Sequence, residues 1–322
     1  MAQITIIGLD TIGMSLGLAL RKSEPPITVV GVDRDGAAAR RAQQLGAVER
    51  TELWAGNACK NSSLVILTEP ISRLRDMLEA IANSLPQGCV VTCTSPLMIP
   101  VLAWAEQLLP EGVSFVAGHP ILNPTKPATE PSAELFRQTQ FCIVPSARAT
   151  SAAMDLVSGL AATIGARPFF VDAAEHDGLI TAVESLSSVL GTLLMSAATE
   201  ASSWRDMRRL AGPSFAQATA TAETDPAEVT AAMRANRENL ARWLETFRAK
   251  LSDARDALAA EDDKPLTKLL ADAREAREQW LLNSRDGNWD GIVEPPTVTM
   301  GELLGKMVWP QRRPPDNKQQ KR

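Results

Sequence analysis

Cysteine and histidine are scarce in this sequence, which has four cysteines and two histidines among 322 residues. Zinc sites and disulfide frameworks are recognised by regularly spaced cysteines, often accompanied by histidines. Neither pattern occurs around the four cysteines, which are Cys59, Cys89, Cys93 and Cys142. We therefore expect reduced, mostly buried thiols and no bound metal.

The sequence also lacks an excess of basic residues. Its 33 lysines and arginines stand against 38 aspartates and glutamates, for a net charge of -5 and a pI near 5.3. Nucleic acid binding requires a basic face, so no such partner is expected. No apolar run is recognised as long enough to span a membrane, and residues 1–7 lack the basic start of a signal peptide. We expect a cytoplasmic protein with no membrane partner.

The length and the 45% hydrophobic content allow a sizeable core and suggest about two domains. Over residues 1–171, short β-branched runs alternate with helical patterns, which is typical of βαβ units. Strands are predicted at 3–7, 28–33, 64–67, 89–92, 114–117, 141–144 and 168–171, with helices at 13–21, 37–45, 71–85, 100–109 and 151–164. The fold class is therefore α/β, with an N-terminal Rossmann-like domain around a doubly wound parallel sheet.

After residue 172 the strand signal ends, and Ala/Leu-rich helical patterns follow at 173–202, 226–258 and 265–282. We predict an all-α domain over 172–284 that binds substrate and forms a homodimer. Two of its helices, 234–251 and 268–282, carry apolar stripes. A monomer would leave these stripes exposed to solvent, unless they pack on one another within the chain. Residues 285–322, rich in proline, glycine and charge, are predicted to form a polar tail.

The first predicted strand runs into Gly-Leu-Asp-Thr-Ile-Gly at 8–13, where a G-x-G-x-x-G dinucleotide fingerprint would stand. Asp33, at the end of the second strand, is the ribose-binding acid typical of NAD sites, while Arg34 leaves NADP open. Asp10 replaces the second glycine. Its carboxylate adds bulk and like charge beside a pyrophosphate, or else caps the following helix. The predicted cofactor-binding residues are Gly8, Asp10, Thr11, Ile12, Gly13, Asp33, Arg34 and Thr68.

Segments spread over roughly residues 3–283 resemble the prephenate/arogenate dehydrogenase family. The most specific are Gly-His-Pro-Ile at 118–121 and Ala-Glu-His-Asp at 174–177. The resemblance implies NAD(P)-dependent oxidative decarboxylation of prephenate or arogenate in tyrosine biosynthesis. It assigns His119 to bind the ring hydroxyl and assist its conversion to a carbonyl, and a neutral imidazole is chemically suited to accept that proton. The alternative for His119 is a packing or loop-capping role.

The sequence departs from the family pattern at three further places. The family's Asp-x-x-Ser-x-Lys is Cys-Thr-Ser-Pro-Leu-Met at 93–98, which leaves Ser95 as a second catalytic candidate. A Ser-His-Leu-Pro-His stretch lining the substrate pocket is Glu-Ser-Leu-Ser-Ser at 184–188. Phe-Arg-x-x-Thr-Arg, which holds the substrate carboxylates, is Phe-Ala-Gln-Ala-Thr-Ala at 215–220. The candidate replacements for the lost guanidinium groups are Arg205, Arg208 and Arg209.

The second histidine, His176, is predicted to fix the domain junction, because adjacent helical side chains at 175–177 diverge and suit a metal poorly. Three functions stay open at this point. The first is a dehydrogenase with impaired activity, and the second is an inactive homologue with a regulatory or structural role as a dimer. The third is a dehydrogenase altered to take a less anionic substrate, against which the change at Asp10 counts.

Overall fold

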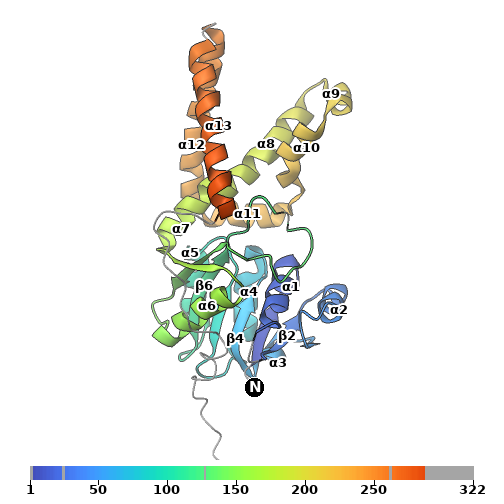
Figure 1. The fold of residues 1–322 in the computed structure, drawn as a ribbon, viewed down its shortest axis with the longest axis vertical. Coiled ribbons are helices and arrows are strands. Elements are labelled where there is room, and N and C mark those ends of the chain that lie inside the picture. The colour runs from blue at the N-terminus through green and yellow to red at the C-terminus, as the bar shows by residue number, and fades with distance from the viewer. Residues whose placement is uncertain (1–2, 24–25, 127, 261–262, 287–322) are drawn as a thin grey trace, which may run out of the picture.

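The computed structural model describes residues 3–23, 26–126, 128–260 and 263–286 (Figure 1). Eight strands form one sheet in the order β3-β2-β1-β4-β5-β6-β7-β8. The chain moves outward from β1 in both directions, so the sheet is doubly wound. The strands are β1 Gln3–Ile7, β2 Thr28–Val32, β3 Arg50–Thr51, β4 Ser62–Leu67, β5 Val90–Cys93, β6 Ser114–Pro120, β7 Gln140–Pro145 and β8 Arg167–Phe170.

All seven predicted strands are present, and the structure adds the two-residue strand β3, which is too short to leave a pattern. Strands β1 to β6 pair in parallel, as predicted. The sheet is mostly parallel, and the one pair that departs from the predicted parallel arrangement is β6 with β7, which runs antiparallel. No helix is formed between these two strands in the described residues of that connection, and an antiparallel return needs no crossover helix.

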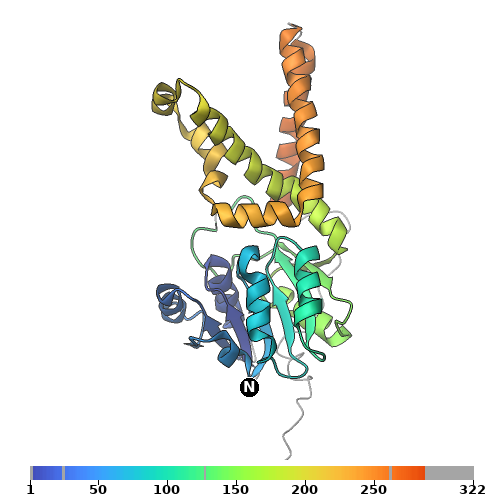
Figure 2. The same cartoon turned by 180° about the vertical axis from the view of Figure 1, so that it is seen from behind.

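Helices cover both faces of the sheet (Figures 1 and 2). One face packs against α1 Thr11–Leu20, α2 Gly36–Gln44 and α6 Ser151–Thr163. The other packs against α3 Ala55–Cys59, α4 Ile71–Ala82 and α5 Ile99–Leu108. Because both faces are covered, the central strands are buried along their whole length, which explains their continuous apolar runs. All four cysteines are free and buried, as predicted.

The helical domain begins directly after β8. Its elements are α7 Ala173–Ile180, the π-helical turn η1 Thr181–Ser185, α8 Leu186–Glu200, α9 Trp204–Leu210, α10 Pro213–Thr219, the 3-10 turn η2 Ala220–Glu223, α11 Pro226–Ala235, α12 Arg237–Ala259 and α13 Asp263–Asp286. Asp225 caps α11 by accepting a hydrogen bond from the Ala227 amide. Most of the predicted polar tail, residues 287–322, lies outside the described residues.

The predicted helix over 226–258 is interrupted at Asn236, where α11 ends and α12 begins. The Asn236 amide nitrogen donates to the Asp177 carbonyl oxygen at 2.9 Å and to the Thr181 hydroxyl at 2.5 Å. These bonds join α12 to the α7–η1 segment. A periodicity analysis does not detect such a break, because the apolar spacing continues across it.

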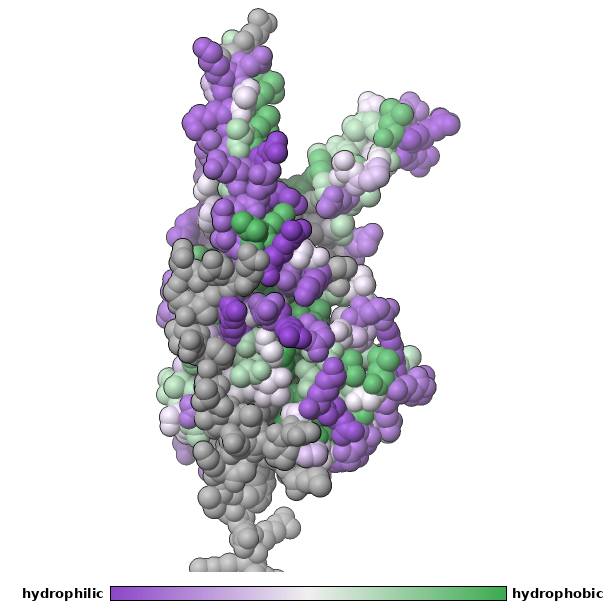
Figure 3. All heavy atoms as spheres, viewed as in Figure 1, coloured by the Kyte–Doolittle hydropathy of each residue, from purple (hydrophilic) through white to green (hydrophobic). Residues whose placement is uncertain are grey.

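Two arms diverge from the base of the helical domain (Figures 1 and 2). One holds α8, α9 and α10, and the other is the α12–α13 hairpin. Their shared core is small, with Leu186, Val189 and Leu240 buried at the base. Figure 3 shows apolar side chains along the edge of the hairpin that faces the other arm. Packing within the chain therefore leaves much of the stripes uncovered, and the exposed large apolar side chains include Leu193, Leu194, Met207, Leu210, Trp243, Leu251, Leu258, Leu269, Leu270, Trp280 and Leu282.

The continuous helical segment Ala173–Glu200 has 28 residues and a mean hydropathy of 1.5, so by length and composition alone it is able to cross a membrane. Scattered serines and Glu184 interrupt its apolar run, so the sequence did not predict such a segment. The same test is passed by helices that pack inside a protein, and this segment contacts α10, η2 and α12.

Candidate functional site

A cavity of about 340 Å³ lies at the carboxyl ends of β1, β2, β4 and β5, where ligands of doubly wound sheets bind. Of the predicted cofactor residues, it is lined by Gly8, Asp10, Ile12, Asp33 and Thr68. The other three are their chain neighbours: Thr11 and Gly13 lie in the first turn of α1, and Arg34 follows Asp33. The structure thus brings the predicted set to one place.

The turn between β1 and α1 requires glycine at two positions. Gly8 has φ +97°, and a Cβ there would lie 2.5 Å from the Thr68 hydroxyl oxygen. A Cβ on Gly13 would lie 2.0 Å from the Gly8 carbonyl oxygen. Thr68 itself donates to that carbonyl at 2.5 Å, which fixes the turn against β4. The tight turn and the close packing of the helix start, which the first and third glycines of a dinucleotide fingerprint provide, are therefore retained.

Asp10 caps α1, the second of the two roles that the sequence left open. Its Oδ1 accepts a hydrogen bond from the Gly13 amide at 2.8 Å. Burial raises the pKa of Asp10, and the nearby charge of Asp33 raises it further. A carboxylate thus already occupies the helix N-terminus, the place where a pyrophosphate gains from free amides and the helix dipole.

Further carboxylates surround the same cavity. Asp33 accepts hydrogen bonds from the amides of Leu9 at 2.6 Å and Asp35 at 2.7 Å, which hold its carboxylate at the end of β2. Glu69, whose pKa is raised by burial, lies 3.4 Å from Arg73. Across the cavity, Glu228 of α11 accepts hydrogen bonds from the first amides of α4, Ile71 at 2.9 Å and Ser72 at 3.2 Å. This last contact joins the helical domain to the sheet beside the cofactor cavity.

The two histidines of the chain meet at the junction of the domains. His119 belongs to β6, one residue inside its end, where the sequence placed it just beyond the strand. Its Nδ1 lies 3.2 Å from Nε2 of His176 on α7. The Nδ1 of His176 lies 3.0 Å from Asp177 Oδ1, and Asp177 also accepts hydrogen bonds from the amides of Met98 at 2.7 Å and Ile99 at 3.0 Å. We call His119, His176 and Asp177 the histidine chain.

When both rings are neutral, the contacts of the histidine chain fix one tautomer for each imidazole. The Asp177 carboxylate only accepts, so His176 donates to it from Nδ1 and keeps a lone pair on Nε2. That lone pair accepts from Nδ1 of His119, which leaves the lone pair of His119 on Nε2. Burial, together with the neighbouring His176, lowers the pKa of His119 to about 3, so the imidazole is neutral at physiological pH.

Glu184, which takes the place of a serine in the family pattern, lies next to His119. Its Oε1 lies 3.8 Å from His119 Nε2, and its side chain is 46% exposed whereas that of His119 is 8% exposed. Burial raises the pKa of Glu184, and the neighbouring His176 partly offsets this. The sequence signal that could have found this site is the confinement of both histidines to the two most specific motifs.

The predicted catalytic residue Ser95 lies in the turn after β5, where it is buried. Its hydroxyl donates to the Leu97 carbonyl oxygen at 2.9 Å and accepts from the Leu97 amide at 3.2 Å. These bonds hold the turn, so the structure does not join Ser95 to His119, and its catalytic role stays a prediction. Met98, in place of the family's lysine, is fully buried and contributes its amide to Asp177.

The proposed arginine replacements lie away from this site within one chain. Arg205, Arg208 and Arg209 are exposed on α9, at the far end of the α8 arm (Figure 1). Ala216 and Ala220 are exposed on the same arm. The described chain therefore brings none of these guanidinium groups to the histidine chain.

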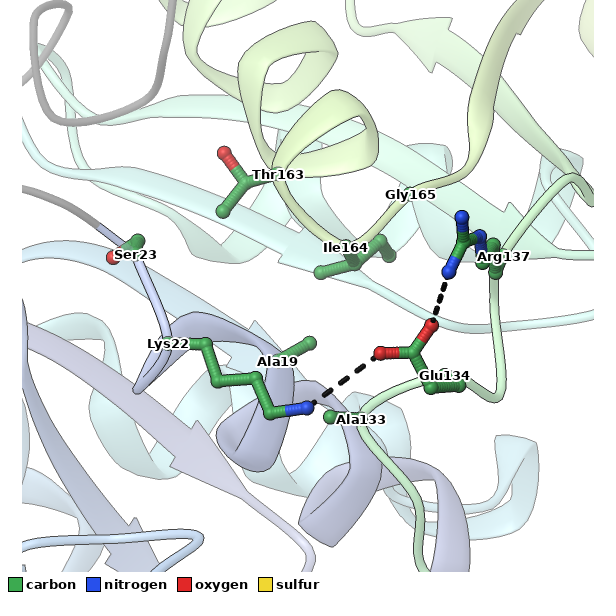
Figure 4. A pocket seen from close by; sticks show the side chains of 9 residues that line it. All are labelled: Ala19, Lys22, Ser23, Ala133, Glu134, Arg137, Thr163, Ile164 and Gly165. Atoms are coloured by element: carbon green, nitrogen blue, oxygen red, sulfur yellow. Dashed lines mark hydrogen bonds and ion pairs between the residues drawn. The ribbon is translucent and has the colours of Figure 1, made fainter.

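A separate cavity of about 250 Å³ lies between the end of α1 and the end of α6 (Figure 4). Lys22 and Arg137 both reach Glu134, at 3.5 Å and 3.1 Å, so the charges in this cavity are paired. It contains none of the predicted site residues, and we assign it no ligand.

Comparison with known proteins gives matches over both domains. The family described as "Prephenate dehydrogenase, nucleotide-binding domain" matches residues 16–169, and "Prephenate dehydrogenase, dimerization domain" matches residues 172–272. The chain is 23% identical over 285 residues to the prephenate dehydrogenase of Bacillus subtilis, covering 88% of this chain and 77% of that one. It is 26% identical over 278 residues to the cyclohexadienyl dehydrogenase of Zymomonas mobilis, covering 85% and 94%.

Solved structures show the same fold. The prephenate dehydrogenase of Aquifex aeolicus, in complex with hydroxyphenyl propionate and NAD+, superposes with a TM-score of 0.77 at 20% identity, covering 87% of this chain and 98% of that one. The arogenate dehydrogenase of Synechocystis superposes with a TM-score of 0.68 at 19% identity, covering 86% and 99%.

Proposed function

The chain belongs to the prephenate dehydrogenase family, and on that premise we propose that it is an NAD-dependent dehydrogenase acting on prephenate or arogenate in tyrosine biosynthesis. The observation that carries this proposal is the histidine chain. It leaves a neutral imidazole with its lone pair on Nε2 of His119, at the carboxyl edge of the sheet that also holds the nucleotide cavity. An alcohol is oxidised only if its hydroxyl proton has an acceptor, and this lone pair provides one.

The residues of the cavity fit a dinucleotide at three points. Gly8 and Gly13 keep the tight turn and the close packing of the helix start, and Asp33 is held at the end of β2 where a ribose hydroxyl is bound. When bound, NAD supplies the hydride acceptor. The strand β6 with His119 is three strand spacings from β1, about 14 Å, so one elongated ligand along this edge reaches both places. Asp10, at the N-terminus of α1, opposes this fit most directly, and Glu69 and Glu228 add negative charge to the cavity lining.

The choice between prephenate and arogenate, and between NAD and NADP, is tested by titration followed by an assay. Calorimetry with each cofactor measures binding, and absorbance of reduced cofactor measures turnover with each substrate. We expect NAD binding and measurable turnover with at least one substrate. Cofactor binding without turnover on either substrate would contradict the proposed reaction, and no binding at all would contradict the whole proposal.

One observation favours the second candidate, a catalytically inactive dimeric homologue with a regulatory or structural role. Asp10 already bonds the Gly13 amide that a pyrophosphate would use, and it adds a negative charge beside Asp33. A chain without cofactor binding would still keep the helical domain. The titration above separates the two candidates.

We also propose that the protein is a homodimer located in the cytoplasm. The match of residues 172–272 to a dimerization domain and the exposed apolar side chains of both arms support the dimer. A C2 interface would cover the apolar faces that one chain leaves exposed. The biosynthetic role of the family supports the location.

A further inference from the structure

Glu184 lies where the family pattern has a serine, in the π-helical turn η1, Thr181–Ser185. Turns of this kind insert an extra residue into a helix and often occur at functional sites. Here the turn is held by the Asn236 amide nitrogen, which donates to the Asp177 carbonyl oxygen and the Thr181 hydroxyl. The Glu184 carboxylate in this turn has its Oε1 3.8 Å from Nε2 of His119.

Glu184 also lines a cavity of about 370 Å³. The other residues around this cavity carry no charge, and they include Leu122, Asn123, Gln138, Gln140, Val183 and Trp280. With its side chain 46% exposed, Glu184 connects the buried imidazole to the open cavity.

A proton taken up by His119 has to leave again before the next turnover. The burial that keeps the imidazole neutral also disfavours the imidazolium that forms during the reaction. In the other direction the histidine chain ends at Asp177, whose side chain is 2% exposed and already bonded to His176 and two amides. A proton moved to Asp177 would have no route to solvent. Glu184, beside His119 and partly exposed, offers a route for the proton to solvent.

We propose that Glu184 is the proton exit of this site, receiving from His119 Nε2 the proton released by the substrate hydroxyl. The inference rests on the proposed dehydrogenase function. In the oxidation, the substrate O–H bond breaks as an Nε2–H bond forms. The carbon that bears this hydroxyl gives up its hydride to NAD+ and becomes the carbonyl carbon. The Nε2–H bond then breaks, Glu184 gains the proton, and water in the cavity removes it. Glu184 acts through His119 and is therefore a positioning and relay residue.

The test compares Glu184→Gln, which keeps the shape but carries no exchangeable carboxyl proton, with the wild type. We expect kcat to fall about 100-fold, the scale of one proton-transfer step, with KM for substrate nearly unchanged. Glu184→Asp should recover part of the rate, and added acetate should restore turnover to Glu184→Gln. Glu200→Gln, the same change at an exposed glutamate that ends α8, is the matched control and should keep the wild-type kcat.

The pH profile separates a relay from a structural role. The titratable groups facing Glu184 are His119 on β6, Cys142 on β7 and His176 on α7. In the proposed relay, Glu184 has to be ionised to accept the proton from His119. The part of the kcat–pH profile in which kcat rises as Glu184 ionises should therefore disappear in Glu184→Gln. A variant that keeps the wild-type kcat and profile, while the wild type turns over, would overturn the Glu184 inference and leave the proposed function standing.

A second measurement needs no turnover. The chain has two histidines, so nitrogen NMR of labelled imidazoles resolves each ring. The Nε2 signal of His119 should move as Glu184 titrates and should lose that movement in Glu184→Gln. If the signal does not move in the wild type, Glu184 does not interact with His119 Nε2, and the inference is overturned. A wild type that moves as expected but never reduces NAD with either substrate would overturn the proposed function, and the relay role with it.

Discussion

At the scale of single residues, we expect Asp10 to weaken NAD binding in the nucleotide cavity. It caps α1 through the Gly13 amide, and burial raises its pKa. Asp10→Gly frees the helix N-terminus and should strengthen NAD binding about tenfold, because a charge there is worth up to about 2 kcal/mol and 1.4 kcal/mol is one factor of ten. Calorimetric titration measures the change. Asp10→Asn keeps a capping side chain without its charge, so it should give an intermediate affinity, and equal affinities in all three proteins would refute this account.

His119 also makes a residue-scale prediction about stability and pH. Its pKa is lowered from 6.5 to about 3 by burial and by His176. Between these values the unfolded chain binds a proton at this position and the folded chain does not, so stability is lost as the pH falls below about 6.5. His119→Asn lacks this titration and should show a shallower loss in urea unfolding between about pH 7.5 and about pH 4.5. Identical slopes for the two proteins would mean that the His119 pKa is not lowered by folding.

At the scale of elements, Asn236 is the joint between α11, α12 and the α7–η1 segment. It is buried and donates to Asp177 and Thr181. Asn236→Ala leaves a buried carbonyl oxygen without its partner, which commonly costs about 1–3 kcal/mol of the free energy of unfolding. Urea unfolding measures this loss. The exposed Asn57→Ala is the control and should change the free energy by less than about 0.5 kcal/mol, and an equal effect of both substitutions would show that the joint does not stabilise the domain.

At the scale of the whole molecule, the two arms expose more apolar surface than their small shared core covers. We expect sedimentation velocity to give twice the chain mass of 34.6 kDa. Leu194→Glu and Leu270→Glu place charge on the arms and should shift the protein toward monomer, because an unpaired buried charge opposes association. Leu53→Glu, at a side chain 89% exposed on the sheet domain, should leave the dimer intact. A wild type that sediments as a monomer at all concentrations would exclude the dimer.

The sequence by itself determined the features that depend on neighbours along the chain. Short apolar runs between helical patterns predicted every strand but the two-residue β3. The spacing of Gly8, Gly13 and Asp33 predicted the nucleotide turn. Both predictions succeed because periodicity and turn chemistry depend on residues close together in the chain. The sequence also singled out His119 through a local motif. The break at Asn236 escaped it, since the hydrogen bonds that produce that break come from residues more than 50 positions away.

Only the tertiary structure decided what the site residues do. It turned β7 antiparallel, left Asp10 bonded to a helix amide, and brought His176, Asp177 and Glu184 around an imidazole from a different domain. Tautomers, pKa shifts and proton routes depend on burial and on partners across space, and neither is encoded by the order of nearby residues. The sequence thus identified His119, and the packing of the two domains against each other determined the protonation state of its imidazole.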